Sequence, residues 1–156
     1  MELTPDSILN NRYKIIRKLG QGGMGAVFEA YDQTLETQVA VKTNFNPAPE
    51  SVAQFLQEAR LLASLKHPNL PRVTDYFVIG NEQFLVMDFI PGDDLGKRAK
   101  PGEMMAVDDV LGWSLKLSDA LAYLHRQNPP VIHRDIKPAN IKITPAGELF
   151  LVDFGI

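Results

Sequence analysis

A glycine-rich turn between two predicted strands is the feature that most restricts how this chain can fold. Residues 20–27 read Gly-Gln-Gly-Gly-Met-Gly-Ala-Val, a G-x-G-x-x-G-x-V pattern. A dinucleotide-binding turn with these glycines must open a helix at its last glycine. Here the aromatic and β-branched residues of 27–31 predict a strand instead, and residues 12–19 predict another strand before the turn. The pattern therefore predicts a two-stranded hairpin whose turn can offer backbone N–H groups to phosphates, unless its glycines simply mark a turn.

The next predicted strand carries a lysine that faces the same way as a small residue. Alternation in Val39-Ala40-Val41-Lys42 places Ala40 and Lys42 on one face of the strand. Ala40 leaves room for a flat ring, and Lys42 supplies a cation for the α- and β-phosphates of a nucleotide. The plainer alternative is an ordinary strand that ends in a solvated lysine.

A predicted helix at 52–65 supplies a carboxylate that can hold this lysine in place. Ser51 and Gln54 have the spacing of a capping box, and apolar residues recur at helical spacing after them. Glu58 lies at the edge of the apolar stripe, where an unpaired carboxylate is costly. Carboxylates at such an edge are commonly solvated, but with Lys42 available we expect the two side chains to pair.

A polar segment near the end of the chain gathers the groups that phosphoryl transfer requires. Residues 133–140 read His-Arg-Asp-Ile-Lys-Pro-Ala-Asn, and residues 153–155 read Asp-Phe-Gly. Transfer to a hydroxyl group needs a proton acceptor, a cation that meets the γ-phosphate charge, and ligands for Mg²⁺. Standing alone, the segment could also be a polar loop between two strands. The candidates for the three roles are, in order, Asp135, Lys137, and the pair Asn140 and Asp153.

The five motifs together resemble the protein kinases, and in particular the eukaryotic-like Ser/Thr kinases of bacteria. The resemblance runs from about Tyr13 to Ile156; the Gly-Gly-Met-Gly form of the turn is similar to bacterial members, and Lys137-Pro138 is similar to the Ser/Thr branch. It implies an α+β, protein-kinase-like fold. We expect an N-terminal extension at 1–12, an N-lobe of antiparallel sheet plus one helix at 13–89, and the hinge exit with the first part of the helical C-lobe at 90–156.

The resemblance also implies roles for individual residues. Asp135 would be the catalytic base and Lys42–Glu58 the activating ion pair, with ATP and Mg²⁺ as cofactors. His133 would pack against Phe154, and Met87 resembles the gatekeeper residue before the hinge. The residues implied to contact ATP are Leu19, Gly20, Gly22, Gly25, Val27, Ala40, Lys42, Met87, Asp88, Ile90, Asp94 and Lys142. Among these, Asp88 and Ile90 would use backbone groups at the adenine edge, and Asp94 would meet the ribose.

The chain departs from the family pattern at two places. Lys142 stands where the family usually carries an apolar residue under the adenine, and we expect its aliphatic stem to cover the ring while the ammonium reaches solvent. The sequence also stops at Ile156, directly after Asp-Phe-Gly. We therefore expect a fragment with impaired activity, in which Arg134 lacks the activation segment that it can grip in relatives.

The second half of the chain has one long helix and two short strands in its pattern. Residues 107–126 predict the helix, with Trp113 outside the stripe formed by Val110, Leu117, Leu121 and Leu124. Ile141, Ile143 and the run 149–152 predict two strands that are joined by a turn at 145–147.

Composition excludes several other classes of protein. The absence of cysteine rules out disulfides and thiolate metal sites, and the net charge of -3 gives no basic footprint for nucleic acid. No apolar run reaches membrane-spanning length, and no signal-peptide pattern occurs. We therefore expect a cytoplasmic Ser/Thr protein kinase with a protein substrate and no nucleic-acid or membrane partner. A non-catalytic ATP-binding or interaction module derived from a kinase domain, and a small-molecule phosphotransferase, stay open as alternatives.

Overall fold

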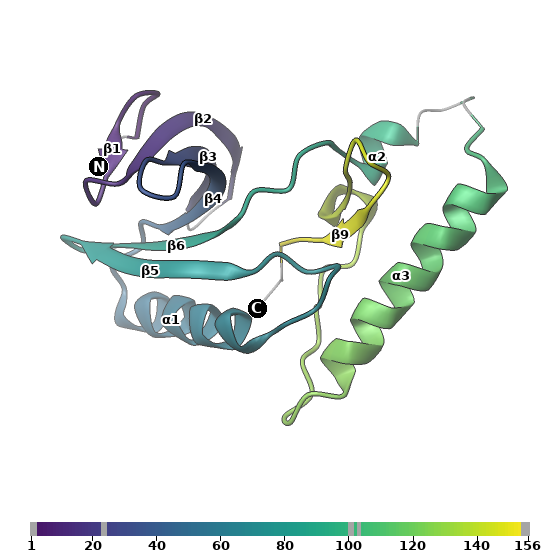
Figure 1. Cartoon of the computed structure of the whole chain (residues 1–156). Coiled ribbons are helices and arrows are strands. Elements are labelled where there is room, and N and C mark those ends of the chain that lie inside the picture. Colours follow the sequence, from purple (N-terminus) through teal and green to yellow (C-terminus); the bar gives the residue numbers. More distant parts are fainter. Residues whose placement is uncertain (1–2, 23–24, 100–101, 103, 154–156) are drawn as a thin grey trace. The chain divides into compact units, whose positions relative to one another are not determined.

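The computed structural model describes residues 3–22, 25–99, 102 and 104–153. The chain divides into two compact units: unit 1 comprises Met1–Leu65 with Arg72–Phe89, and unit 2 comprises Lys66–Pro71 with Ile90–Ile156. Unit 1 contains a six-stranded sheet and a helix, and unit 2 contains a three-stranded sheet with a long helix (Figure 1). The predicted α+β class is therefore confirmed.

The sheet of unit 1 is antiparallel throughout and has the order β1-β2-β3-β4-β6-β5. The glycine-rich turn joins β2 to β3, with Gly20 opposite Val27, so the predicted hairpin is confirmed and no helix opens at this turn. The strands are β1 (Ile8–Leu9), β2 (Tyr13–Gln21), β3 (Ala26–Asp32), β4 (Thr37–Asn44), β5 (Val73–Ile79) and β6 (Glu82–Asp88).

The two faces of β4 have different tasks. Val39 and Val41 point into the hydrophobic core of unit 1, together with residues of β2, β3 and β6. Because side chains alternate along a strand, Lys42 and Asn44 point to the opposite face. The helix α1 (Pro49–Ser64) packs against β4, β5 and β6 and meets both of these polar side chains (Figure 1).

The start of α1 differs from the prediction. The helix begins at Pro49 with Ala48 as its N-cap, and no side chain caps it, so the predicted capping box of Ser51 and Gln54 is wrong. Proline is favoured in the first turn because its missing N–H would have no helical partner there. Ser51 is already inside the helix, and its Oγ donates to Oδ1 of Asn44 at 3.2 Å.

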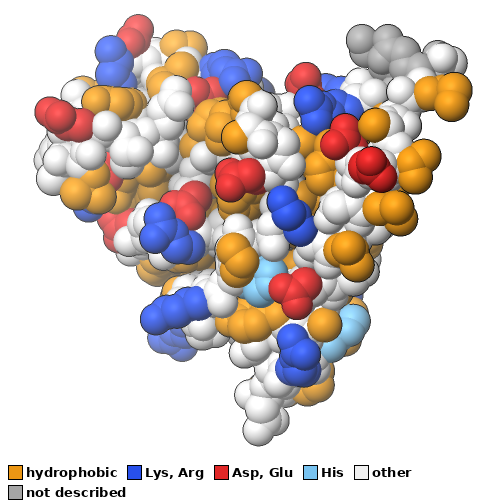
Figure 2. Space-filling model, turned by 45° about the vertical axis from the view of Figure 1, so that its right-hand side comes forward, with side chains coloured by type: hydrophobic (Ala, Val, Ile, Leu, Met, Phe, Trp, Pro, Cys, Tyr) orange, Lys and Arg blue, Asp and Glu red, His pale blue; other side chains and the backbone are white. Residues whose placement is uncertain are grey.

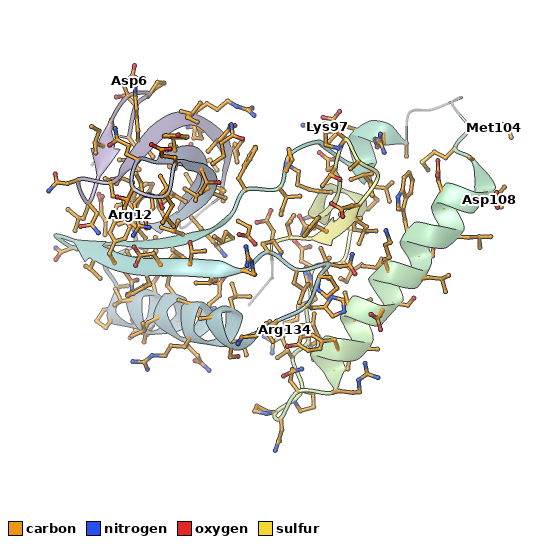
Figure 3. All side chains as sticks on the ribbon, viewed as in Figure 1. Asp6, Arg12, Lys97, Met104, Asp108 and Arg134 are labelled. Carbon is orange, nitrogen blue, oxygen red and sulfur yellow. The ribbon has the colours of Figure 1, made fainter. Side chains whose placement is uncertain are left out.

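Residues before Tyr13 are part of the sheet of unit 1. Leu9 in β1 pairs with Tyr13 and is 1% exposed, which makes it a core residue. Arg12, which is labelled in Figure 3, lies just before β2. Its guanidinium donates to both carboxylate oxygens of Asp32 as a two-bond fork, with distances of 2.8 and 2.7 Å. This fork lowers the pKa of Asp32, so the carboxylate is ionised and fastens the chain just before β2 to the end of β3.

Unit 2 is organised around a short sheet and the helix α3 (Val107–His125). Ala120 and Leu124 of α3 are buried, whereas Val110, which was predicted to belong to the buried stripe, is exposed. Trp113 precedes Ala120 by seven residues and Leu124 by eleven, so it shares their face of the helix and its predicted place outside the stripe is wrong. It is half-buried, and its Nε1 donates to the Gly147 carbonyl at 3.3 Å. The remaining elements are β7 (Asp93–Asp94), α2 (Leu95–Arg98), the 3₁₀ helix η1 (Pro138–Asn140), β8 (Ile141–Ile143) and β9 (Leu149–Leu151).

One face of α3 carries apolar side chains that remain exposed within the described structure. Val107, Leu111 and Leu115 follow one another at intervals of four residues, and all three are exposed. Hydrophobic side chains accordingly appear on the surface along the right-hand edge in Figure 2. Among the described residues, no helix has the length and apolar character needed to cross a membrane.

The packing of β1 leads to a direct test of its place in the core. Leu9→Ala should lower the free energy of unfolding by about 3 kcal/mol, because it removes a buried side chain and leaves a cavity. Ile8→Ala is the matched control, since Ile8 is the neighbouring residue but is 54% exposed. The control should change the free energy by no more than about 0.5 kcal/mol. Urea unfolding of both variants measures the difference, and equal effects would contradict the assignment of β1 to the core.

Candidate functional site

Lys42 and Glu58 form an ion pair within unit 1. Nζ of Lys42 contacts Oε1 of Glu58, and the two side chains are 25% and 7% exposed. The pair exists because alternation turns Lys42 toward α1, while the helical repeat turns Glu58 inward with Phe55 and Leu62. A carboxylate buried to this degree needs a compensating charge, and Lys42 provides it.

The glycines of the turn have different surroundings. A Cβ atom on Gly25 would lie 1.8 Å from the backbone oxygen of Thr43, so only glycine fits at this position. A Cβ atom on Gly20 or Gly22 would meet nothing within 4 Å. The fold therefore requires Gly25, whereas the space beside Gly20 and Gly22 is open and available to a ligand.

The apolar residues predicted to cover a nucleotide ring lie on neighbouring strands. Val27 of β3 is opposite Lys42 of β4, and Ala40 of β4 is opposite Met87 of β6. Ala40 is buried, while Val27 and Met87 are half-buried and Leu19 is exposed. The sheet thus brings a small residue, partly accessible apolar side chains and a cation onto adjoining strands.

The segment predicted to meet the adenine edge has a partner that the sequence did not reveal. The side chain of Arg72 donates to Oδ2 of Asp88 at 3.0 Å, and the backbone N–H of Asp88 donates to the Arg72 carbonyl at 2.9 Å. Arg72 also donates its own backbone N–H to Oδ2 of Asp88. Arg72 precedes β5 in a segment without a motif, so only the pairing of β5 with β6 could have indicated this contact.

Asp135, Lys137 and Asn140 form one cluster in unit 2. Nζ of Lys137 lies 2.8 Å from Oδ2 of Asp135, and Nδ2 of Asn140 donates to the same oxygen at 2.9 Å. The hydrogen bond from Lys137, followed by that from Asn140, lowers the pKa of Asp135. Asp135 is half-buried and ionised at neutral pH, which is the state that a proton acceptor requires.

Asn140 also connects this cluster to Asp153. Its Nδ2 lies 3.5 Å from the Asp153 carbonyl, and its own carbonyl accepts the N–H of Val152 at 2.9 Å. These contacts occupy the amide nitrogen, so Oδ1 is the side-chain atom that Asn140 can present to a metal. Asp153 is exposed and has φ of 54°, an uncommon backbone conformation for a residue other than glycine.

His133 is a buried histidine with a structural task. It is 1% exposed, its Nε2 lies 3.2 Å from the Val152 carbonyl, and its Nδ1 accepts the N–H of Asp135 at 3.4 Å. Burial lowers the pKa of His133, which favours the neutral ring with the proton on Nε2. The ring therefore fixes the backbone at Asp135. The predicted contact with Phe154 lies outside the described residues.

Asp94 and Lys142, which are predicted to contact the nucleotide, also interact with other residues of unit 2. Oδ1 of Asp94 accepts the backbone N–H of Lys97 at 3.0 Å, so Asp94 is the N-cap of α2. Lys142 is opposite Asp94 in the β7–β8 pairing and is half-buried. Burial, reinforced by Lys97, lowers the pKa of Lys142, which is the opposite of the effect that a nearby carboxylate alone would have.

The predicted site residues thus fall into two groups, each held together within its own unit. Unit 1 holds Leu19, Gly20, Gly22, Gly25, Val27, Ala40, Lys42, Glu58, Met87 and Asp88, and unit 2 holds Ile90, Asp94, Asp135, Lys137, Asn140, Lys142 and Asp153. No group of three or more acidic, histidine or cysteine side chains that could hold a metal occurs among the described residues.

Comparison with known proteins gives a consistent set of relatives. The family model described as the protein kinase domain matches residues 13–156. Serine/threonine-protein kinase PknA of Mycobacterium tuberculosis is 36% identical over 156 residues, with 95% of this chain and 36% of PknA covered. Human serine/threonine-protein kinase tousled-like 2 is 33% identical over 159 residues, with 95% of this chain and 21% of the relative covered. The chain thus spans little more than a third of the first relative.

Solved structures show the same fold. The apo form of PpkA-294 matches with a TM-score of 0.82 and 27% identity, covering 99% of this chain and 62% of that one. The kinase domain of PknI from Mycobacterium tuberculosis matches with a TM-score of 0.78 and 27% identity, covering 99% and 64%. The predicted kinase-like fold is therefore confirmed.

The glycine surroundings give a test of which glycine the fold requires. Gly25→Ala should lower the free energy of unfolding by about 2 kcal/mol or more, because its methyl group collides with a backbone oxygen. Gly22→Ala is the control, since open space surrounds it, and it should leave the free energy nearly unchanged. Chemical unfolding measures the free energy of both variants. A similar loss of stability in both would show that the clash with the Thr43 oxygen is not the reason why the fold requires Gly25.

Proposed function

Because this chain belongs to the protein kinase domain family, we propose that it forms the nucleotide-binding part of a serine/threonine protein kinase. The proposed reaction transfers the γ-phosphoryl group of ATP to a serine or threonine hydroxyl of a protein. Such a reaction draws on the ATP pool of the cytoplasm, where we propose that the protein acts. The observation that carries the proposal is the cluster of Asp135, Lys137 and Asn140.

The cluster supports a proton acceptor next to a phosphate-binding cation. Asp135 is ionised and its carboxylate is only partly engaged, so it can accept the proton of an incoming hydroxyl group. Lys137 is exposed, and its Nζ lies 2.8 Å from Oδ2 of Asp135. From this position the ammonium can contact an incoming γ-phosphate while it stays next to Asp135. Positioning and charge compensation of this kind supply most of the rate in phosphoryl transfer.

Unit 1 would bind the rest of the nucleotide. Lys42 is the proposed contact of the α- and β-phosphates, and Glu58 holds its ammonium in one place. Gly20 and Gly22 leave space for phosphates to approach the backbone. Ala40, Val27 and Leu19 are proposed to contact the adenine ring. Lys142 and Asp94 are proposed as separate nucleotide contacts.

The oxygen atoms of Asn140 and Asp153 fit Mg²⁺, the metal that protein kinases use with ATP. Mg²⁺ prefers oxygen ligands and is commonly bound by one or two carboxylates together with substrate phosphates. The exposed carboxylate of Asp153 and Oδ1 of Asn140 offer such ligands. When bound, the ion would neutralise the phosphate charge, while Asn140 keeps Asp135 aligned through its amide nitrogen.

The first experiment separates catalysis from binding. Asp135→Asn should keep MgATP affinity within about twofold of the original and abolish phosphoryl transfer, since a proton acceptor is not needed to hold ATP. Asp153→Asn should weaken Mg²⁺-dependent binding itself. Calorimetric titration with MgATP and transfer assays with Ser/Thr peptides measure the two properties.

Three results of this experiment would count against the proposal. A loss of nucleotide affinity in Asp135→Asn as large as that in Asp153→Asn would remove the division of roles. Transfer to small-molecule acceptors but not to peptides would indicate a small-molecule phosphotransferase. MgATP binding without transfer to any acceptor would indicate a non-catalytic ATP-binding module.

The second experiment concerns the ion pair. Lys42→Met should lower MgATP affinity at least tenfold and should also destabilise the fold by about 3 kcal/mol, because it leaves a buried carboxylate unpaired. Glu58→Gln should weaken binding less, since Lys42 keeps its charge. In the double variant Lys42→Met/Glu58→Gln the stability should recover while the affinity stays low. Unchanged affinity in Lys42→Met would contradict its proposed role.

A further inference from the structure

A buried cluster of amide and hydroxyl side chains joins the first turns of α1 to the sheet of unit 1. This amide cluster consists of Asn44, Ser51, Tyr76 and Gln83. Nδ2 of Asn44 donates to Oε1 of Gln83 at 3.0 Å and to the Ser51 carbonyl at 3.3 Å. Oδ1 of Asn44 accepts the hydroxyl group of Ser51 at 3.2 Å. Both amides are almost completely buried, with Asn44 3% and Gln83 2% exposed.

Gln83 extends the cluster along the helix and back to the sheet. Its Nε2 donates to the Val52 carbonyl at 3.1 Å and to the hydroxyl oxygen of Tyr76 at 2.6 Å. Asn44 and Gln83 are opposite each other in the β4–β6 pairing, so the sheet itself sets the spacing of the two amides. Two adjacent strands, β4 and β6, thereby hold the carbonyl groups of two consecutive helical residues, and Tyr76 of β5 bonds to Gln83 from the next strand.

The amide cluster and the Lys42–Glu58 pair connect the same two elements at two separate points. Asn44 follows Lys42 by two residues, so both side chains are on one face of β4, about 7 Å apart along the strand. Glu58 follows Ser51 by seven residues, which is two helical turns and about 10 Å. Ser51 and Glu58 therefore share one face of α1, and both are buried there.

Two connections between α1 and the sheet restrict motions of the helix that a single connection would allow. A single ion pair between long side chains allows the helix to rotate about its axis and to slide along the strand. The apolar contacts of α1 define its rotation and height less sharply than hydrogen bonds do, because hydrophobic burial has little directionality. Hydrogen bonds have narrow distance and angle requirements, so bonds from Asn44 and Gln83 to Ser51 and Val52 define both the rotation and the height of the helix.

We propose that the amide cluster is a positioning device that sets α1 so that Glu58 meets Lys42. Asn44 and Gln83 are then positioning residues that act on the nucleotide through Glu58 and do not touch it. Buried amides stabilise little compared with apolar side chains of the same size, so the benefit of the cluster is the placement of the helix. Its consequence for nucleotide binding rests on the function proposed above for Lys42.

The test measures how strongly Lys42 and Glu58 remain coupled when the cluster is opened. The coupling free energy comes from urea unfolding of the original protein, Lys42→Met, Glu58→Gln and the double variant. The same four measurements are repeated in an Asn44→Ala background. If the cluster positions the helix, the coupling should fall by at least half in that background. A merely structural Asn44 would destabilise all four proteins equally and leave the coupling unchanged, and this result would overturn the proposal.

Two further variants keep the test decisive. Ser51→Ala removes only the hydroxyl group, so it gives a milder opening of the cluster if Asn44→Ala does not fold, and it should also reduce the coupling. Tyr13→Phe is the control, because it removes a partly buried hydrogen bond of 2.7 Å to Asp75 that lies outside the cluster. A reduced coupling in Tyr13→Phe would mean that any loosening of the sheet has this effect, which would overturn the proposal.

Nucleotide affinity then reports on the proposed function separately. In Asn44→Ala the affinity for MgATP should fall about fivefold, the order of magnitude expected for coupled neighbours. In a Glu58→Gln background the same substitution should have less than a twofold effect. Reduced coupling with unchanged affinity in Lys42→Met would uphold the positioning device and reject the phosphate-binding role of Lys42. If Asn44→Ala lowered MgATP affinity equally in the original protein and in the Glu58→Gln variant, Asn44 would not act through Glu58, and the proposal would be overturned.

Discussion

The buried carboxylate of Glu58 is the constraint on which the arrangement of unit 1 depends. A charge that is 7% exposed needs an opposite charge within reach, and Lys42 is the cation that the structure supplies. Lys42 can reach it only because β4 alternates, with its valines in the core and its polar residues toward α1. The amide cluster adds the second connection that a helix needs in order to keep its carboxylate in place. The ion pair is therefore the outcome of strand register, helical repeat and polar anchoring together.

In unit 2, hydrogen bonds from the neutral side chain of Asn140 hold the neighbouring residues in place. Asn140 is buried, and its amide nitrogen donates to the side chain and the backbone of Asp135. The same nitrogen lies 3.5 Å from the Asp153 carbonyl, so one residue contacts both the proposed proton acceptor and the proposed metal ligand. His133, kept neutral by burial, supports the Asp135 backbone from another side. The chemistry of this segment thus depends on uncharged groups that fix two carboxylates.

The sequence predicts those features of fold and site that have a local pattern. The hairpin around the glycines follows from the strand residues after Gly25. The Lys42–Glu58 pair follows from the alternation of side chains along the strand and the apolar repeat of the helix. The predicted start of α1 was wrong. Pro49 occupies the first turn, and Ser51 bonds to Asn44 of β4 instead of capping the helix. The bonds of Gln83 and Arg72 could not be predicted, since each depends on the pairing of strands that lie far apart in the sequence.

The measurement that tests the central claim most directly is a calorimetric titration of the protein with ATP in the presence and absence of Mg²⁺. The proposed function predicts saturable binding of one nucleotide per chain, which weakens strongly when Mg²⁺ is removed by a chelator. Failure to bind ATP at millimolar concentration, or binding of equal strength with and without Mg²⁺, would contradict the assignment of Asn140 and Asp153 as metal ligands in a nucleotide site.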